Sequence, residues 1–162
     1  MSAKAIADNL KRLAQRVVWA ALFVISIPLL IVSGIAWSFA VVTVHIAAWL
    51  RGFGRPWVVM VYSDSPKWKA HVEEQLIPSL AAPVSILNLS RRAQWGNLSL
   101  GRYAFRLFAG RREYCPLALV FLPGKPVRTF RFYRSFVEAK HGRLDQLRQI
   151  EAELEAFLGG FL

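Results

Sequence analysis

Two features of this 162-residue chain could suggest covalent chemistry. There is one cysteine, Cys115, and a short polar stretch, Ser63-Asp64-Ser65, follows an apolar run. A single cysteine excludes an internal disulfide and a multi-cysteine metal cluster. Cys115 could be a reactive thiol that forms a mixed disulfide with a partner, or a small buried hydrophobic residue. We favour the second role, because it is the usual one for a free cysteine.

The polar stretch could suggest a hydroxyl nucleophile. Such a nucleophile needs an adjacent base, and neither His71 nor His141 has an evident triad partner in the sequence. We therefore expect Ser63 or Asp64 to cap a following helix, with Pro66 in its first turn. The sequence carries no glycine-rich phosphate loop, paired-histidine metal motif or kinase signature, so we predict neither a cofactor nor a metal.

Positive charge is in large excess, with 21 Lys and Arg against 10 Asp and Glu. A basic surface attracts the phosphates of anionic lipids or of nucleic acid, although it could also simply keep a membrane-tethered domain soluble. Cations flank the long apolar run and cluster again after it. We predict contacts with lipid or phosphate for the following members of these groups: Lys11, Arg12, Arg16, Arg51, Arg55, Arg102, Arg106, Arg111 and Arg112.

Arginine alternates with aromatic residues in residues 128–134, "RTFRFYR". Such alternation occurs on surfaces that bind single-stranded nucleic acid. It is equally expected of a strand that buries Phe130 and Phe132 and guards an exposed sheet edge with charges. We rank the structural edge first, a lipid surface second and nucleic acid a distant third.

Residues 17–50 contain no Asp, Glu, Lys or Arg over 34 positions, which makes them a candidate membrane segment. As one straight helix they would span about 51 Å, against a hydrocarbon core of about 30 Å. They therefore form either one tilted helix or a helical hairpin that turns near Pro28 and Ser33-Gly34. We favour the hairpin, because cations flank both ends and cytoplasmic flanks collect Lys and Arg. Residues 1–16 are predicted to form a basic amphipathic helix.

Residues 51–56 are predicted to be a linker, followed by one folded domain over residues 57–162. Hydrophobic patterning predicts the order β-α-β-α-β-β-α. The strands are expected at residues 57–63, 84–90, 117–123 and 127–136, and the helices at about 66–80, 98–108 and 143–158. Strands separated by a helix should pair in parallel, the last two should form an antiparallel hairpin, and helices should cover both faces of the sheet.

Two segments of this domain resemble the thioredoxin superfamily. "VVMVYSDSPKWKAHVEEQLIPSL" is similar to that family's first strand, active-site loop and long helix. "EYCPLALVFLPGKPVRTF" is similar to its cis-proline, following strand and turn. The resemblance covers about residues 57–158 and implies that Pro116 is the cis-proline and that Cys115 faces residues 63–66. No cysteine lies between Ser63 and Lys69, so the usual dithiol exchange is excluded for this chain by itself.

The prediction for function is a membrane-anchored, redox-inactive thioredoxin-like domain that binds or scaffolds a protein partner, or serves as an accessory subunit of a membrane complex. The expected contact surface consists of Ser63, Asp64, Ser65, Pro66, Lys67, Cys115 and Pro116. The alternative is a thiol oxidoreductase that uses Cys115. The expected location is the bacterial inner membrane with the domain in the cytoplasm; the alternative is a single span with the domain outside.

Overall fold

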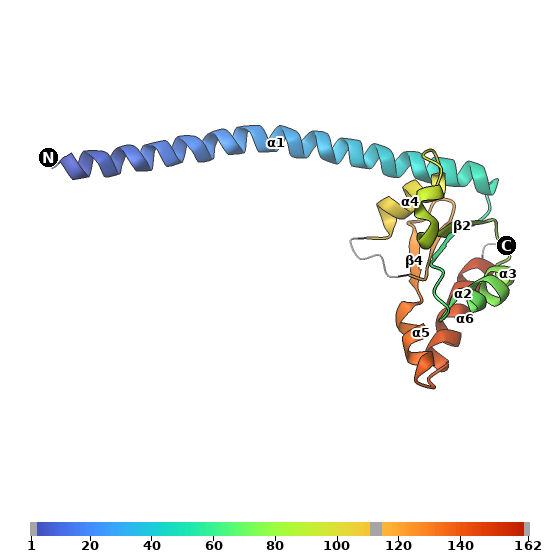
Figure 1. Cartoon of the computed structure of the whole chain (residues 1–162). Helices are drawn as coiled ribbons and strands as arrows, with labels where there is room; N and C mark the ends of the chain where they lie inside the picture. Colours follow the sequence, from blue (N-terminus) through green and yellow to red (C-terminus); the bar gives the residue numbers. More distant parts are fainter. Residues whose placement is uncertain (1–2, 111–114, 161–162) are drawn as a thin grey trace. The chain divides into compact units, whose positions relative to one another are not determined.

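The structure, a computed structural model, describes residues 3–110 and 115–160 (Figure 1). The chain divides into two units, Met1–Val42 and Thr43–Leu162, which are described separately. Arg111 and Arg112, two of the predicted lipid contacts, lie outside the described residues.

The first unit is formed by helix α1 (Ala3–Gly52), which also supplies the first ten residues of the second unit. The favoured hairpin is wrong, because the helix continues through Pro28 and through Ser33-Gly34. Proline removes one backbone hydrogen-bond donor, and glycine only lowers helix stability. Neither residue ends a helix here, because no polar turn sequence lies beside it. Residues Lys11–Gly52 form a helix that is long and apolar enough to cross a membrane, judged by length and composition.

A four-stranded sheet forms the centre of the second unit, in the order β2-β1-β3-β4. The strands are β1 (Trp57–Tyr62), β2 (Val84–Asn88), β3 (Leu117–Phe121) and β4 (Arg128–Arg131). β1 and β2 are parallel, as predicted, and β3 and β4 are antiparallel, as predicted. The prediction that every helix-separated pair would be parallel is wrong for β3, which pairs antiparallel with β1. The two strands that are buried along their whole length, β1 and β3, occupy the central positions, and the less apolar β2 and β4 form the edges.

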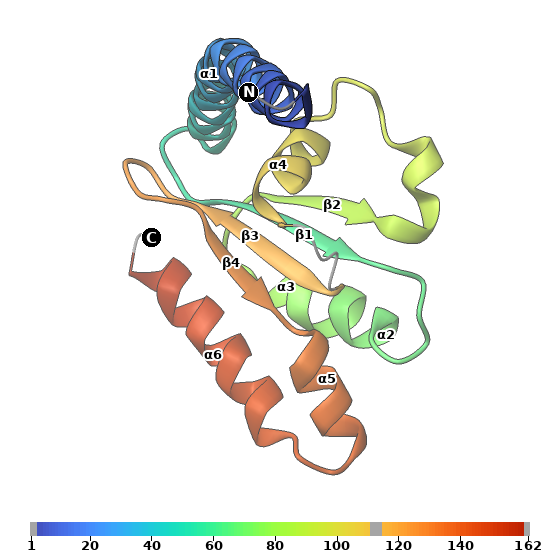
Figure 2. The ribbon, with the colours of Figure 1, turned by 90° about the vertical axis from the view of Figure 1, so that its left-hand side faces the viewer.

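The helical segments that follow β1 and β4 cover one face of the sheet (Figure 2). The chain after β1 forms α2 (Lys69–His71), a π-helical turn η1 (Val72–Leu76) and α3 (Ile77–Ser79) without interruption. α5 (Tyr133–Lys140) and α6 (Asp145–Gly159) complete this layer. Val72 and Leu154 are fully buried here against Val58 and Met60 of β1.

The opposite face is covered by α4 (Leu100–Phe108) and by the end of α1. A 3-10 segment, η2 (Leu89–Gln94), leads from β2 toward α4. Val44 and Ala48 of α1 are buried in the same cluster as Trp57, Val59 and Phe121. The last turns of the apolar helix are therefore part of the core of the folded unit, and helices cover both faces of the sheet as predicted.

The predicted fourth strand, residues 127–136, is only half correct. β4 ends at Arg131, Phe132 has helical dihedral angles (φ −87°, ψ −12°), and α5 follows at once. Tyr133, Phe136 and Val137 are spaced by three and four residues, which is the period of a helix. Polar and aromatic residues alternate in "RTFRF", which is typical of a strand. The predicted strand therefore extends too far, beyond the point where the helical period begins.

Candidate functional site

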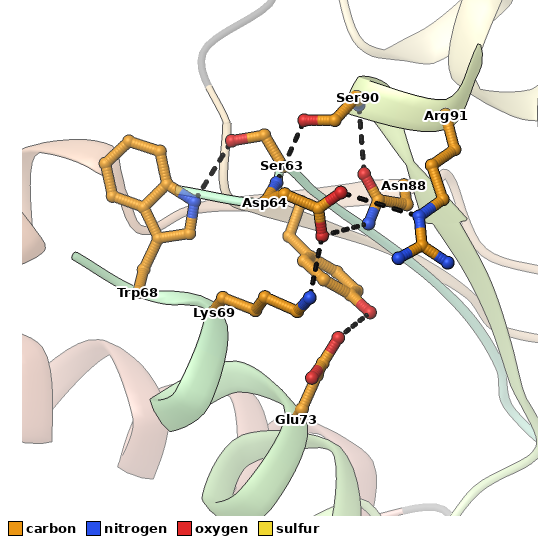
Figure 3. A network of polar contacts seen from close by, with 9 residues as sticks. Ser63, Asp64, Trp68, Lys69, Glu73, Asn88, Ser90 and Arg91 are labelled. Carbon is orange, nitrogen blue, oxygen red and sulfur yellow. Dashed lines mark hydrogen bonds and ion pairs between the residues drawn. The ribbon is translucent and has the colours of Figure 1, made fainter. Parts of the chain in front are cut away.

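The loop after β1 is held by a network of polar side chains, and it does not cap a helix as predicted (Figure 3). α2 begins only at Lys69, and its N-cap residue, Trp68, makes no side-chain capping bond. The Ser65 carbonyl instead accepts hydrogen bonds from the N–H groups of Trp68 (3.3 Å) and Lys69 (3.0 Å). The side chains of Ser63 and Asp64 are thereby left for contacts with other segments.

Asp64 lies at the centre of this network. Its Oδ1 accepts hydrogen bonds from Lys69 Nζ and Asn88 Nδ2, both at 2.9 Å, and its Oδ2 lies 3.5 Å from Arg91 Nε. Its backbone N–H donates to Ser90 Oγ at 3.0 Å. The hydrogen bonds from Lys69 and Asn88 lower the pKa of the Asp64 carboxyl below its ordinary value of 3.8. Asp64 therefore joins the loop after β1 to the segment after β2.

The partners of Asp64 were not among the predicted site residues. Asn88, Ser90 and Arg91 lie at the end of β2 and in η2. Because β1 and β2 are parallel, their carboxyl ends meet at the same edge of the sheet, with Tyr62 opposite Asn88. The signal that could have identified them is the position of these polar residues directly after the second predicted strand.

Two aromatic side chains hold the loop from the other side. Trp68 Nε1 donates to Ser63 Oγ at 3.2 Å, and Tyr62 Oη donates to Glu73 Oε1 at 2.6 Å. Burial, together with the neighbouring Glu73 carboxylate, raises the pKa of Tyr62 to about 12. The phenol is therefore a stable hydrogen-bond donor at physiological pH.

Cys115 lies beside this loop, and the Cys115–Pro116 peptide bond is cis, as the resemblance implied. Cys115 is buried, its Sγ lies 3.5 Å from the Val61 carbonyl oxygen, and its side chain interacts with Ser63. Burial raises the pKa of the thiol from 9.0 to about 11, although the Ser63 hydrogen bond acts to lower it. Since the thiolate is the nucleophile, a thiol with this pKa is poorly reactive at neutral pH.

The predicted contact surface is therefore brought together in part. Ser63 contacts Cys115, and Asp64 is half-buried within its own network. Ser65 turns the chain, and Pro66 and Lys67 are exposed at the tip of the loop. Of the predicted contact residues, Pro66 and Lys67 are therefore the most accessible to a binding partner.

The predicted lipid contacts that the structure describes in the folded unit lie at the end of α1, just after it and on α4. Arg51 and Arg55 are exposed near the end of α1, and Arg106 is exposed on α4. Arg102 is half-buried and donates to Asn97 Oδ1 at 3.0 Å. In the first unit, the side chains of Lys11, Arg12 and Arg16 are exposed on α1.

The arginine–aromatic segment has structural contacts. Phe130 and Phe132 are buried, as predicted. Arg128 Nη2 lies 3.1 Å from Glu153 Oε1, and its guanidinium stacks over the rings of Phe130 and Phe157. Arg131 donates to the Ala109 carbonyl at the end of α4 at 2.7 Å. These contacts agree with the interpretation that was ranked first, a charged and structural sheet edge.

Within residues 3–110 and 115–160, no group of three or more His, Cys, Asp or Glu side chains could hold a metal ion. Comparisons with known protein families, with curated proteins and with solved structures found no match to this chain.

Proposed function

We propose that this chain is a membrane-anchored binding module whose thioredoxin-like domain docks a protein partner through the loop at residues 63–69. The observation that carries the proposal is the Asp64 network, which fixes the loop at the sheet edge while leaving Pro66 and Lys67 exposed. A surface that is already ordered loses little conformational entropy when it binds, so it suits recognition.

Several features support a thioredoxin-like domain. A parallel β1–β2 pair and an antiparallel β3–β4 pair share one sheet, in the order β2-β1-β3-β4. Helical segments follow β1 on one face of this sheet, and α4 lies on the other. The loop after β1 faces the residue before a cis-proline.

The burial and raised pKa of Cys115 argue against the alternative, a single-cysteine oxidoreductase. A redox cysteine is usually accessible and has a lowered pKa, whereas Cys115 is buried and its pKa is about 11. If Cys115 nevertheless acts on a partner, Cys115→Ser will abolish the cellular phenotype of the chain. The binding role predicts that this phenotype is unchanged.

The anchor in this proposal is a single crossing. Residues 43–52 pack within the folded unit, which leaves residues 17–42 for the membrane. Twenty-six helical residues reach about 39 Å, so one crossing spans a hydrocarbon core of about 30 Å and its ends extend into the head-group regions. A single crossing places the folded unit on the side of the membrane opposite Lys11, Arg12 and Arg16. Since these cations directly precede the span, the positive-inside rule favours the earlier alternative, a domain outside the cytoplasm.

Docking can be tested by site-specific photo-crosslinking in native membranes. A photoreactive phenylalanine analogue replaces Lys67, and a matched control replaces Arg148, an exposed residue on α6. The proposal expects a discrete protein adduct at position 67 that is absent at position 148 and weakened by Asp64→Asn. Identical adducts at both positions, or none at position 67, would contradict it.

Topology is tested independently with a cysteine at position 67 in the Cys115→Ser background. A membrane-impermeant maleimide should label this cysteine in intact cells as strongly as in opened cells. Labelling that requires opened cells would place the domain in the cytoplasm.

A further inference from the structure

A pocket of about 660 Å³ lies between the start of α2 and α5, beside the loop but separate from the Asp64 network. Pockets that bind small molecules commonly have volumes of about 300–1,000 Å³. We call it the Trp68 pocket, after the residue that lies between the loop and α2. Its lining residues all belong to the second unit, including Leu147 of α6.

Aromatic rings from two elements line this pocket. The Trp68 ring lies 6.2 Å from the rings of both Tyr133 and Phe136, and the His71 ring packs edge-on against Phe136 at 5.4 Å. Because Trp68 Nε1 donates to Ser63, the polar edge of the indole is already satisfied. Tyr133 and the neighbouring Val137 remain 38% and 39% exposed. Aromatic surfaces of this kind favour a planar apolar group in an offset or edge-to-face arrangement.

The charged groups that line the pocket are all basic. Lys67 and Lys140 are exposed at its rim, His71 and His141 contribute imidazoles, and none of the lining residues is an Asp or Glu. Glu151 lies 2.6 Å from Nε2 of the lining residue His71, and Glu138, which precedes the lining residue Ala139, pairs with Arg143. Exposed cations beside an apolar pocket favour an anionic occupant.

We infer that the Trp68 pocket binds a small organic anion with an aromatic body, such as an aryl phosphate or aryl carboxylate. The aromatic body lies against Trp68 and Tyr133, and the anionic group lies between Lys67 and Lys140. This inference goes beyond the proposed function, because the pocket needs neither a protein partner nor the membrane to be complete.

Binding is tested by calorimetry with the full chain in phosphatidylcholine nanodiscs, after subtraction of an empty-nanodisc blank. The probe is 2-naphthyl phosphate, for which we expect a Kd on the order of 100 µM. Inorganic phosphate lacks the aromatic body and 2-naphthol lacks the anionic group, so each should bind at least tenfold more weakly than the probe. If either binds as tightly as the probe, the inference is wrong. Tighter binding of octyl phosphate would show that the pocket selects an alkyl chain, and would overturn the aromatic assignment.

Two matched variants identify the pocket as the site. The double variant Lys67→Gln/Lys140→Gln should weaken probe binding about five- to tenfold, because exposed ion pairs each contribute a few-fold. Lys125→Gln, which changes an exposed lysine outside the pocket, should leave the Kd unchanged. Both lysines of the double variant are exposed, so its circular dichroism spectrum and melting temperature should match those of the wild type. A double variant that binds the probe like the wild type would overturn the inference. Binding of the probe is measured without any protein partner, so its failure is distinguishable from a failure of the crosslinking at position 67.

Discussion

At the scale of single residues, the chemistry of the loop depends on which groups are buried and which are paired. Cys115 and Ser63 interact beneath the loop, whereas the Asp64 carboxylate takes part in ion pairs at the sheet edge. Burial disfavours the charged thiolate, and the cationic and amide partners favour the charged carboxylate. The two titratable groups are therefore shifted in opposite directions, toward a neutral thiol and an ionised acid.

The thiol of Cys115 should react slowly in the folded protein. Its pKa of about 11, against an ordinary value of 9.0, lowers the thiolate fraction at neutral pH roughly 100-fold, and burial slows access further. Iodoacetamide labelling at pH 7.5, followed by mass spectrometry, should show modification at least 100-fold slower than in urea-unfolded protein. Labelling at similar rates in both states would mean that Cys115 is exposed and reactive.

Asp64 should make the stability of the folded unit depend on acid pH. Its pKa is lower in the folded state, so the ionised carboxylate stabilises the fold above the ordinary pKa of 3.8. This contribution is lost as the pH falls through the lower, folded-state value. Asp64→Asn should therefore reduce the melting temperature at pH 7, and the difference from wild type should shrink below pH 4.

The control for this experiment is Asp145→Asn, which removes an exposed carboxylate in the first turn of α6, away from the loop. If the melting temperature of Asp64→Asn differs from wild type equally at pH 7 and pH 3, the ionised carboxylate is not what stabilises the loop.

At the scale of elements, the last turns of α1 have a different role from the rest of the helix. Ala48 is 2% exposed within the cluster that contains Trp57 and Phe121, whereas Ile46 on the same helix is 55% exposed. A close-packed contact of this kind tolerates added volume poorly. The end of α1 therefore belongs to the folded unit, and no break in the apolar run before it marks where that unit begins.

Ala48→Phe should destabilise the folded unit by about 1–3 kcal/mol, since overpacking a buried site has a cost of that size. Ile46→Phe adds aromatic volume at an exposed position of the same helix and should change the free energy of unfolding by less than about 0.5 kcal/mol. Both changes keep the helix apolar, so neither should affect membrane insertion. Chemical denaturation in micelles measures both variants. Equal stability of the two would show that residues 43–52 do not pack into the core.

At the scale of the whole molecule, the folded unit begins inside the apolar helix rather than after it. Thr43–Leu162 contains the sheet, both helical layers and the helix end that covers Trp57. The long apolar segment and the core of the folded unit therefore share one uninterrupted helix.

Truncation should reveal this boundary. A fragment of residues 43–162 keeps the end of α1, which packs in the same cluster as Trp57, and should fold cooperatively in solution. A fragment of residues 53–162 lacks Val44 and Ala48, so the apolar core surface against which they pack becomes exposed to water. This fragment should have a lower melting temperature or aggregate. Thermal unfolding followed by circular dichroism compares the two fragments. If the two fragments have the same melting temperature, residues 43–52 are not needed for the stability of the folded unit.

The sequence by itself determined the features that depend on local pattern. An uncharged run of 34 residues predicts a long apolar helix, and apolar runs flanked by helical periodicities predict an α/β sheet covered on both faces. The absence of cysteine from residues 63–69 excluded a dithiol loop, and the local resemblance around Cys115 and Pro116 implied the cis bond that the structure contains.

Only the tertiary structure decided what depends on contacts between distant segments. Whether the apolar run turned back, which of its residues pack into the folded unit and which strand lies beside β3 all depend on packing partners that no local pattern encodes. The same holds for the site. Asp64 meets Asn88 and Ser90, 24 and 26 residues away, because parallel pairing brings two strand ends to one edge. Similarly, Trp68 and Tyr133 share a pocket because α2 and α5 pack on the same face of the sheet.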